Sequence, residues 1–305
     1  MAEYLTLSVD LTNLDAESVE SACLEHGALA ITYSDAGNAP ILEPAPGEFR
    51  LWPQTRLQAV FDASLFSPAV LHDLANALNI ETNRLELQAL ADRVWEREWL
   101  RDFHAMQFGR RLWVAPAHDE VTAPDAVIVH LDPGLAFGTG THPTTAMCLE
   151  WLDANLRGGE RVVDYGCGSG ILAIAALKLG AEHASAFDID PQALIATEDN
   201  ATRNGVAERL SIVRHAAALN AARADVVLAN ILAGPLQELA PRLIALLRPG
   251  GHLVLAGLLS AQAAELQQTY CPQVDLAVTA TRAEWVCLSG TLRALPDARQ
   301  AGGSR

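Results

Sequence analysis

The first 90 residues carry the pattern of a small α+β domain. Four short stretches alternate apolar with polar residues, as half-buried strands do, at 4–9, 28–33, 56–61 and 85–89. Two stretches with apolar residues at helical spacing lie between them. One starts after Asp15, a good N-cap, and ends at Gly27, and the other opens at Ser67-Pro68. The order βαββαβ predicts a ferredoxin-like sheet over residues 1–90.

An aromatic stripe follows at 91–106, which we interpret as a helical linker. Trp95, Trp99 and Phe103 are four residues apart, so their rings fall along one side of a helix. The stripe either packs the linker onto a domain or docks a partner. At the far end of the chain, the polar residues 296–305 predict a frayed tail.

Residues 107–295 alternate short apolar runs with helical segments, which is the pattern of a doubly wound α/β fold. Strands are expected at 111–115, 126–131, 162–163, 184–187, 225–229, 252–256, 272–280 and 284–292. A turn is expected at Arg248–Gly251, and the last two strands should form an antiparallel pair. The segment therefore predicts a Rossmann-like α/β fold with a mostly parallel sheet.

The strand at 162–163 opens the most informative stretch of the chain. Asp164 follows the strand, and three glycines occupy alternate positions at Gly166, Gly168 and Gly170 before a helical segment. Glycines let the backbone bend sharply and let a ligand approach where a Cβ would clash. The next strand delivers Asp188 at its carboxyl end, about 20 residues beyond the turn, where a carboxylate can accept both hydroxyls of a ribose.

The spacing of these residues favours one cofactor class. A dinucleotide fingerprint is G-x-G-x-x-G, whereas the third glycine here comes one residue early. Asp164 would repel a pyrophosphate but suits a ligand with an ammonium group. S-adenosylmethionine has an amino acid end, a sulfonium and a ribose, and it has no phosphate. The alternative is a structural αβ turn that binds nothing.

A glycine-rich polar loop lies just upstream, at 131–145. Thr141 can cap the following helix, with Pro143 inside its first turn. Because the loop precedes the cofactor half of the chain, we expect it to fold over a bound ligand. The alternative is an ordinary helix-capping loop.

Composition limits the classes of partner. The net charge of −16 and the pI near 4.9 argue against tight non-specific binding to nucleic acid, which depends on lysine and arginine. The acid excess favours a basic partner or only keeps the protein in solution. Hydrophobic residues at 50% and charged residues at 19% predict a soluble globular protein.

Cysteine usage and the N-terminus bear on the compartment. The five cysteines are scattered, with no C-x-x-C pair, so we expect reduced thiols and neither a disulfide framework nor a zinc site. The N-terminus lacks a basic region followed by an apolar core, and no apolar run reaches membrane-spanning length. We therefore expect a cytoplasmic protein.

Three runs of residues resemble the PrmA family. They are D-P-G-L-A-F-G-T-G-T-H-P-T-T at 132–145, V-V-D-Y-G-C-G-S-G at 162–170, and A-N-I-L-A-G-P-L at 229–236. The resemblance covers the whole chain. It implies a small substrate-recognition domain, a helical linker and a class I methyltransferase domain with a Rossmann-like, mostly parallel, seven-stranded sheet. It also implies methyl transfer from S-adenosylmethionine to lysine side chains and the N-terminal α-amine of large-subunit ribosomal protein eleven.

The resemblance also implies site residues. By matching motif, cofactor contacts are expected at Thr145, Gly166, Asp188 and Asn230, beside Asp164, Gly168 and Gly170 from the turn. Phe137 and Thr141 resemble the part of the loop that covers the cofactor and the target nitrogen. No dedicated base is evident, since His142 beside Pro143 belongs to the loop and helix cap.

Asn230 has a chemical interpretation of its own. It stands at the carboxyl end of the strand at 225–229, where its oxygen can accept a hydrogen bond from an amine and aim the lone pair at the sulfonium. Related amine and amide methyltransferases place N-P-P-Y or D-P-P-Y here, whereas this chain has N-I-L-A. A roomier amine site fits better than a clamp for a planar amide. The alternative is that Asn230 caps the next helix.

Other functions stay open from the sequence alone. A nicotinamide dehydrogenase is disfavoured by the glycine spacing and Asp164. A methyltransferase acting on RNA or on another protein shares the core, although an RNA enzyme should carry a basic face. A non-catalytic ribosome assembly factor could retain the fold. We expect a monomer.

Overall fold

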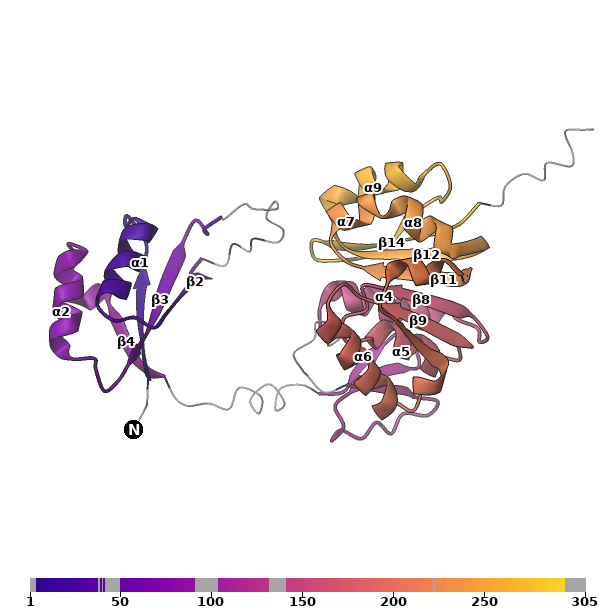
Figure 1. Ribbon diagram of the computed structural model, residues 1–305, viewed down its shortest axis with the longest axis horizontal. Coiled ribbons are helices and arrows are strands. Elements are labelled where there is room, and N and C mark those ends of the chain that lie inside the picture. The colour runs from indigo at the N-terminus through magenta and orange to yellow at the C-terminus, as the bar shows by residue number, and fades with distance from the viewer. Residues whose placement is uncertain are drawn as a thin grey trace, which may run out of the picture. The chain divides into compact units, whose positions relative to one another are not determined.

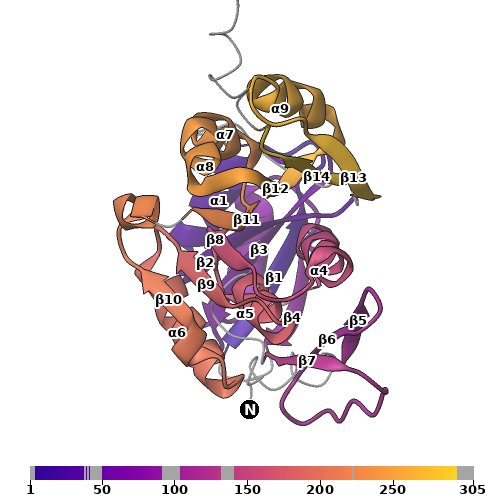
Figure 2. The same ribbon diagram turned by 90° about the vertical axis from the view of Figure 1, so that its right-hand side faces the viewer.

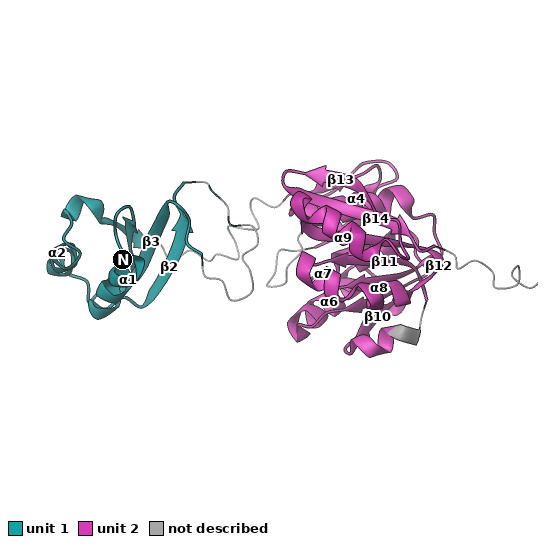
Figure 3. Ribbon diagram, turned by 90° about the horizontal axis from the view of Figure 1, so that it is seen from above, with its two compact units in different colours: residues 1–95 teal, residues 96–305 magenta. Residues whose placement is uncertain are grey.

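The computed structural model describes residues 4–37, 39, 41, 50–90, 104–131, 141–221 and 223–293. The chain divides into two compact units, residues 1–95 and 96–305 (Figure 3). Three predictions fall outside the described residues: the aromatic stripe of the linker, most of the glycine-rich loop including Phe137, and the tail at 296–305.

The first unit is an antiparallel sheet with two helices, as predicted. Its elements are β1 (Tyr4–Asp10), α1 (Ala16–Glu25), β2 (Ala30–Asp35), β3 (Thr55–Asp62), α2 (Pro68–Ala77), the 3-10 turn η1 (Thr82–Arg84) and β4 (Glu86–Leu90). The strand order β2-β3-β1-β4 is that of a ferredoxin-like sheet. Asp15 caps α1, because its carboxylate accepts a hydrogen bond from the Ser18 N–H at 2.9 Å.

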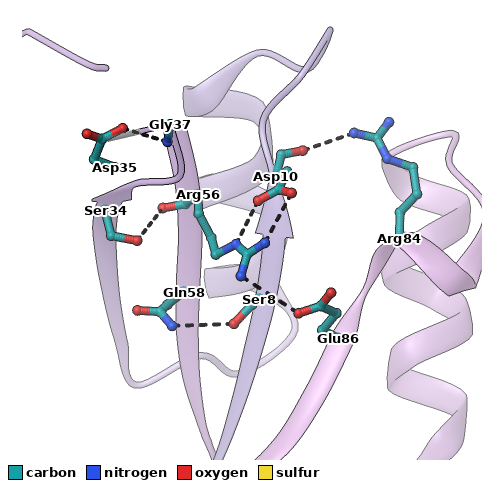
Figure 4. A network of polar contacts seen from close by, with 9 residues as sticks. All are labelled: Ser8, Asp10, Ser34, Asp35, Gly37, Arg56, Gln58, Arg84 and Glu86. Atoms are coloured by element: carbon teal, nitrogen blue, oxygen red, sulfur yellow. Dashed lines mark hydrogen bonds and ion pairs between the residues drawn. The ribbon is translucent and has the colours of Figure 1, made fainter. Parts of the chain in front are cut away.

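The two faces of this sheet differ in chemistry. Leu7, Leu57 and Phe61 lie on the face that packs against the helices, where Leu74 of α2 joins the core. The opposite face is polar. There Arg56 donates two hydrogen bonds to Asp10, at 2.7 and 3.2 Å (Figure 4). Alternation along the strands therefore sends one set of side chains into the core and leaves the other set at the surface.

The second unit contains a small sheet and a large one. The small sheet joins β5 (Met106–Phe108), β6 (Leu112–Ala115) and β7 (Val127–His130) in the order β5-β6-β7. The strands of the large sheet are β8 (Arg161–Tyr165), β9 (His183–Phe187), β10 (Leu210–Val213), β11 (Ala224–Asn230), β12 (Leu247–Leu259), β13 (Ala277–Arg282) and β14 (Trp285–Thr291). Their order is β10-β9-β8-β11-β12-β14-β13, and β14 runs antiparallel to both of its neighbours. The mostly parallel, seven-stranded sheet is confirmed. The strands expected at 111–115 and 126–131 correspond to β6 and β7 of the small sheet, and the edge strand β10 was not among the expected strands.

Helices cover both faces of the large sheet. They are α4 (Pro143–Asn155), α5 (Ile171–Lys178), α6 (Pro191–Arg203), α7 (Ala233–Glu238), α8 (Ala240–Leu246) and α9 (Ala263–Tyr270), with 3-10 turns η2 (Ala207–Arg209), η3 (Ala216–Ala221) and η4 (Ser260–Gln262). Val162 packs in a core with α4 and α5, whereas the next residue, Val163, packs in a second core with α7, α8 and α9. Figures 1 and 2 show α7, α8 and α9 together on one side of the sheet, opposite α4 and α5. Burial of both faces explains the continuous apolar runs of these strands.

One predicted turn belongs to a strand. Arg248–Gly251 lies within β12, because Leu247 already pairs with Ala224 and His252 pairs with Val226. Four residues of β12 therefore bulge out opposite a single residue of β11, and Gly250 takes up a left-handed φ of +75°.

In the described part of the chain, no helix combines the length and apolarity that crossing a membrane requires.

Candidate active site

The glycine turn lies at the carboxyl end of β8. Gly166, Gly168 and Gly170 all have a left-handed φ, at +83°, +53° and +79°. The N–H groups of Gly166 and Cys167 both donate to the Phe187 carbonyl, at 2.7 and 3.0 Å, which ties the turn to the end of β9. An L-residue would be strained at these φ values, so the backbone can bend here at little cost only because these positions are glycine.

Two side chains of helix α6 hold the turn through hydrogen bonds to its carbonyl groups. The Thr197 hydroxyl donates to the Gly168 carbonyl at 3.0 Å, and the Asn200 amide donates to the Ser169 carbonyl at 2.9 Å. A Cβ on Gly170 would come within 2.6 Å of Thr197 Cγ2. Sequence reasoning missed both supports. The available signal was polar residues on the buried face of an amphipathic helix, where they need partners.

Asp188 lies beside the turn, as predicted. One of its carboxylate oxygens accepts from the Gly168 N–H at 2.9 Å, and the other accepts from the Asp190 N–H at 2.9 Å. Its side chain is half-buried. A carboxylate has further lone pairs on both oxygens, so Asp188 can hold the turn and still accept hydrogen bonds from the hydroxyl groups of a ligand.

Asp164 lies fully buried, directly before the turn. One oxygen accepts a hydrogen bond from the Ala173 N–H of α5 at 3.0 Å, and the other has no partner among the described residues. Burial, with a smaller contribution from the charge of Asp188, raises the pKa of this carboxyl to about 7 against the lowering effect of the Ala173 N–H. An unpartnered buried carboxylate oxygen is costly unless a donor or a positive charge comes close.

Asn230 and Thr145 come together from distant parts of the chain. Asn230 is the last residue of β11, and its Nδ2 donates to the Thr145 hydroxyl, in the first turn of α4, at 3.1 Å. Helix α7 has Leu232 at its N-cap, with no side-chain capping bond. Asn230 therefore does not cap that helix, and the alternative interpretation of its role is wrong.

The cap of α4 corrects a second prediction. His142, and not Thr141, is the N-cap residue, because its ring accepts from the Thr144 N–H; Pro143 follows in the first turn as expected. The His142 ring also contacts the Trp285 ring edge-on at 4.9 Å, and burial lowers its pKa. Thr141 is exposed at the end of the loop. His142 thus belongs to the helix cap, as the sequence predicted.

The turn, Asp188 and the pair Asn230–Thr145 line the same carboxyl edge of the sheet. A family model described as ribosomal protein L11 methyltransferase (PrmA) matches residues 3–293. The chain belongs to this family. Family membership agrees with the cofactor inferred from the turn, and the site fits S-adenosylmethionine. The glycine turn admits close approach, and the Asp164 oxygen that no described residue contacts through a hydrogen bond suits a nearby ammonium group. The chain is an S-adenosylmethionine-dependent class I methyltransferase.

Individual relatives of the family support the same assignment. The chain is 50% identical over 291 residues to the "Ribosomal protein L11 methyltransferase" of Pseudomonas paraeruginosa, covering 95% of this chain and 99% of that protein. It is 47% identical over 289 residues to the protein of the same name from Vibrio parahaemolyticus, covering 94% and 98%. The solved structure of a ribosomal protein L11 methylase from Lactobacillus delbrueckii subsp. bulgaricus matches with a TM-score of 0.58 at 31% identity. It covers 63% of this chain and 100% of that one.

Proposed function

We propose that this chain transfers methyl groups from S-adenosylmethionine to amino nitrogens of large-subunit ribosomal protein L11, on lysine side chains and on the N-terminal α-amine. Its relatives carry the name of that activity. The observation that carries the chemistry is the placement of Asn230. It ends the strand adjacent to β8, which leads into the glycine turn, and its amide is already oriented by Thr145.

The donor half of the site follows from the turn. S-adenosylmethionine supplies a methyl group on a positively charged sulfur. Gly166, Gly168 and Gly170 would let the main chain approach its amino acid end, and Asp188 would accept hydrogen bonds from the ribose hydroxyls. Asp164, which directly precedes the turn, would contribute negative charge when ionised. That charge favours a ligand that carries an ammonium group and a sulfonium.

The acceptor half needs a neutral amine, because a protonated amine has no lone pair. A terminal α-amine, with a pKa of about 8, loses its proton readily, whereas a lysine at about 10.4 needs desolvation or a cationic neighbour. The Asn230 Nδ2 is engaged by Thr145, so its Oδ1 is the atom left to accept from the amine N–H. We propose Phe137 and Thr141 as the loop residues that cover the amine and exclude water.

We propose that the first unit recognises the substrate. On the sheet face opposite α1 and α2, the Arg56 guanidinium of β3 pairs with Asp10 of β1 at 2.7 Å and with Glu86 of β4 at 3.8 Å (Figure 4). Arg84 also donates to the Asp10 carbonyl, at 2.9 Å, so these two carboxylates are balanced by two guanidiniums. The preference for a basic protein over nucleic acid therefore rests on the net charge of −16 of the whole chain. We expect the enzyme to act as a monomer in the cytoplasm.

The test is transfer of labelled methyl groups. The full chain is incubated with labelled S-adenosylmethionine and a mixture of ribosomal proteins and ribosomal RNA, and modified residues are mapped by mass spectrometry. The proposal predicts label on amino nitrogens of L11. Label on RNA, or on another protein in place of L11, would contradict it. Calorimetry that detects no S-adenosylmethionine binding would instead favour a non-catalytic assembly factor.

Asn230→Ala tests the acceptor site separately. We expect turnover to fall far more than cofactor affinity, because the variant removes the amine acceptor and leaves the turn and Asp188 in place. An equal loss of turnover and affinity would make Asn230 a cofactor ligand only.

A further inference from the structure

Ile231, directly after Asn230, is a half-buried residue that packs closely against two glycines, Gly166 in the turn and Gly257 in β12. Its Cγ2 methyl occupies the position that a Cβ on Gly166 would need. Its main chain occupies the position that a Cβ on Gly257 would need, with the Ile231 carbonyl carbon at 2.8 Å and its nitrogen at 2.9 Å from that point. Real Cβ atoms essentially never approach other atoms this closely, so both neighbours must be glycine for Ile231 to lie here.

Gly257 has an unusual setting for a core strand residue. It lies inside β12 with a left-handed φ of +86°, where the pairing with β14 shifts register between Leu255 and Leu258. Asn230 pairs with the preceding residue, Ala256, so Gly257 lies beside Ile231. A glycine inside a strand costs stability, and it marks a bulge or a close approach of another backbone. Here it marks both.

We propose that Ile231 is a positioning residue that links the cofactor turn to the amine acceptor. Gly257 fixes the Ile231 main chain, the Cγ2 methyl holds the turn at Gly166, and Asn230 is fixed from its other side by Thr145. The donor and acceptor halves of the site therefore share one packed side chain. The inference rests on the proposed function, because it assumes that Asn230 orients the amine.

Rigid placement matters for this reaction. In-line methyl transfer requires the attacking nitrogen and the methyl to align, and a displacement of about 1 Å can cost about 100-fold in rate. Loss of the Cγ2 contact would let the turn and Asn230 move independently. The expected result is slower chemistry with cofactor binding largely retained, since Asp188 still holds the turn through the Gly168 N–H.

Two substitutions at Ile231 separate this role from simple packing. Ile231→Leu keeps the side-chain volume but removes the β-branch, and with it the Cγ2 methyl. Ile231→Val keeps that methyl and loses a methylene. We expect Ile231→Leu to lower kcat by about tenfold or more with the KM for S-adenosylmethionine changed less than about threefold, and Ile231→Val to lose clearly less. A larger loss of kcat in Ile231→Val than in Ile231→Leu would show that only packed volume matters and would overturn the proposal.

A second matched pair tests the main-chain contact. Gly257→Ala and Gly159→Ala impose the same backbone strain, because their φ values are +86° and +87°, but a Cβ on Gly159 meets nothing within 4 Å. We expect Gly257→Ala to lower kcat and Gly159→Ala to leave it unchanged. Equal kcat in the two variants would contradict the proposal. If Gly257→Ala does not fold, as judged by circular dichroism, the pair at Ile231 decides alone.

Asn230→Ala distinguishes failure of this inference from failure of the proposed function. If Asn230→Ala loses turnover selectively but Ile231→Leu behaves as the parent enzyme does, the link through Ile231 is wrong and the acceptor site stands. If Asn230→Ala loses affinity and turnover equally, the acceptor role itself is wrong, and the coupling proposed for Ile231 fails with it.

Discussion

The buried carboxyl of Asp164 should make cofactor binding depend on pH. In the free enzyme its pKa is raised to about 7, mainly by burial, so below that pH the group is mostly neutral. A bound ammonium group close to the turn would favour the charged form and lower this pKa again. Binding then releases a proton below pH 7, and affinity falls as the pH falls.

The magnitude follows from the size of the shift. Each pKa unit corresponds to about 1.4 kcal/mol, so affinity should weaken by up to about tenfold per pH unit below 7, approaching about 100-fold at pH 5. Above about pH 8 the α-amine of the ligand itself loses its charge, so the useful window is pH 5 to 7.5.

The assay is isothermal titration calorimetry with S-adenosylhomocysteine, which retains the amino acid and ribose and transfers no methyl group. The matched control is Asp164→Asn, which keeps the size of the side chain and an oxygen for the Ala173 N–H but does not titrate. We expect the slope in the parent enzyme and its loss in the variant. An affinity that stays constant between pH 5 and 7.5, or an equal slope in both proteins, would refute the reasoning.

Further predictions concern the supports of the site. Gly170→Ala should destabilise the unliganded enzyme by about 1–2 kcal/mol through backbone strain at φ +79°, and its Cβ would add a further loss by overlapping Thr197 of α6. Gly205→Ala is the control, because Gly205 has a φ of +67° and a Cβ there would meet no atom within 4 Å, so only the strain should appear. Thermal unfolding measures both variants. Thr145→Val should lower kcat by removing the acceptor for the Asn230 amide, and Thr145→Ser should restore most of it. Folding raises the pKa of Asp164, so the contribution of this carboxyl to stability is fully present below about pH 4 and is lost as the pH rises through about 7. Across this window, the free energies of unfolding of the parent and of Asp164→Asn, measured in urea, should diverge by a few kcal/mol at most. Parallel curves would contradict the raised pKa.

Local patterns predicted most of the fold. Alternation and caps located the strands and helices of the first unit, because each of its strands has one face in the core and one in water. In the second unit, continuous apolar runs identified strands such as β8 and β11, which are buried on both faces. The turn predicted at Arg248–Gly251 was wrong because the bulge in β12 depends on its pairing with β11, which no local pattern records.

The candidate site was predicted where its residues follow one another in a motif. Asp164, the three glycines and Asp188 fall within one strand-turn-helix-strand unit, so spacing alone places them together. The hydrogen bond from Thr197 to the turn and the close packing of Gly257 against the Ile231 main chain join elements that lie far apart in the chain. The sequence contains these residues, but only the fold shows what each one touches.

A crystal structure with bound S-adenosylhomocysteine tests the central claim most directly. The account predicts that its amino acid end lies against the turn at Gly166–Gly170 above Asp164. The ribose hydroxyls should bond to Asp188, and the sulfur should face Asn230. A ligand bound elsewhere, or one whose sulfur points away from Asn230, would contradict it.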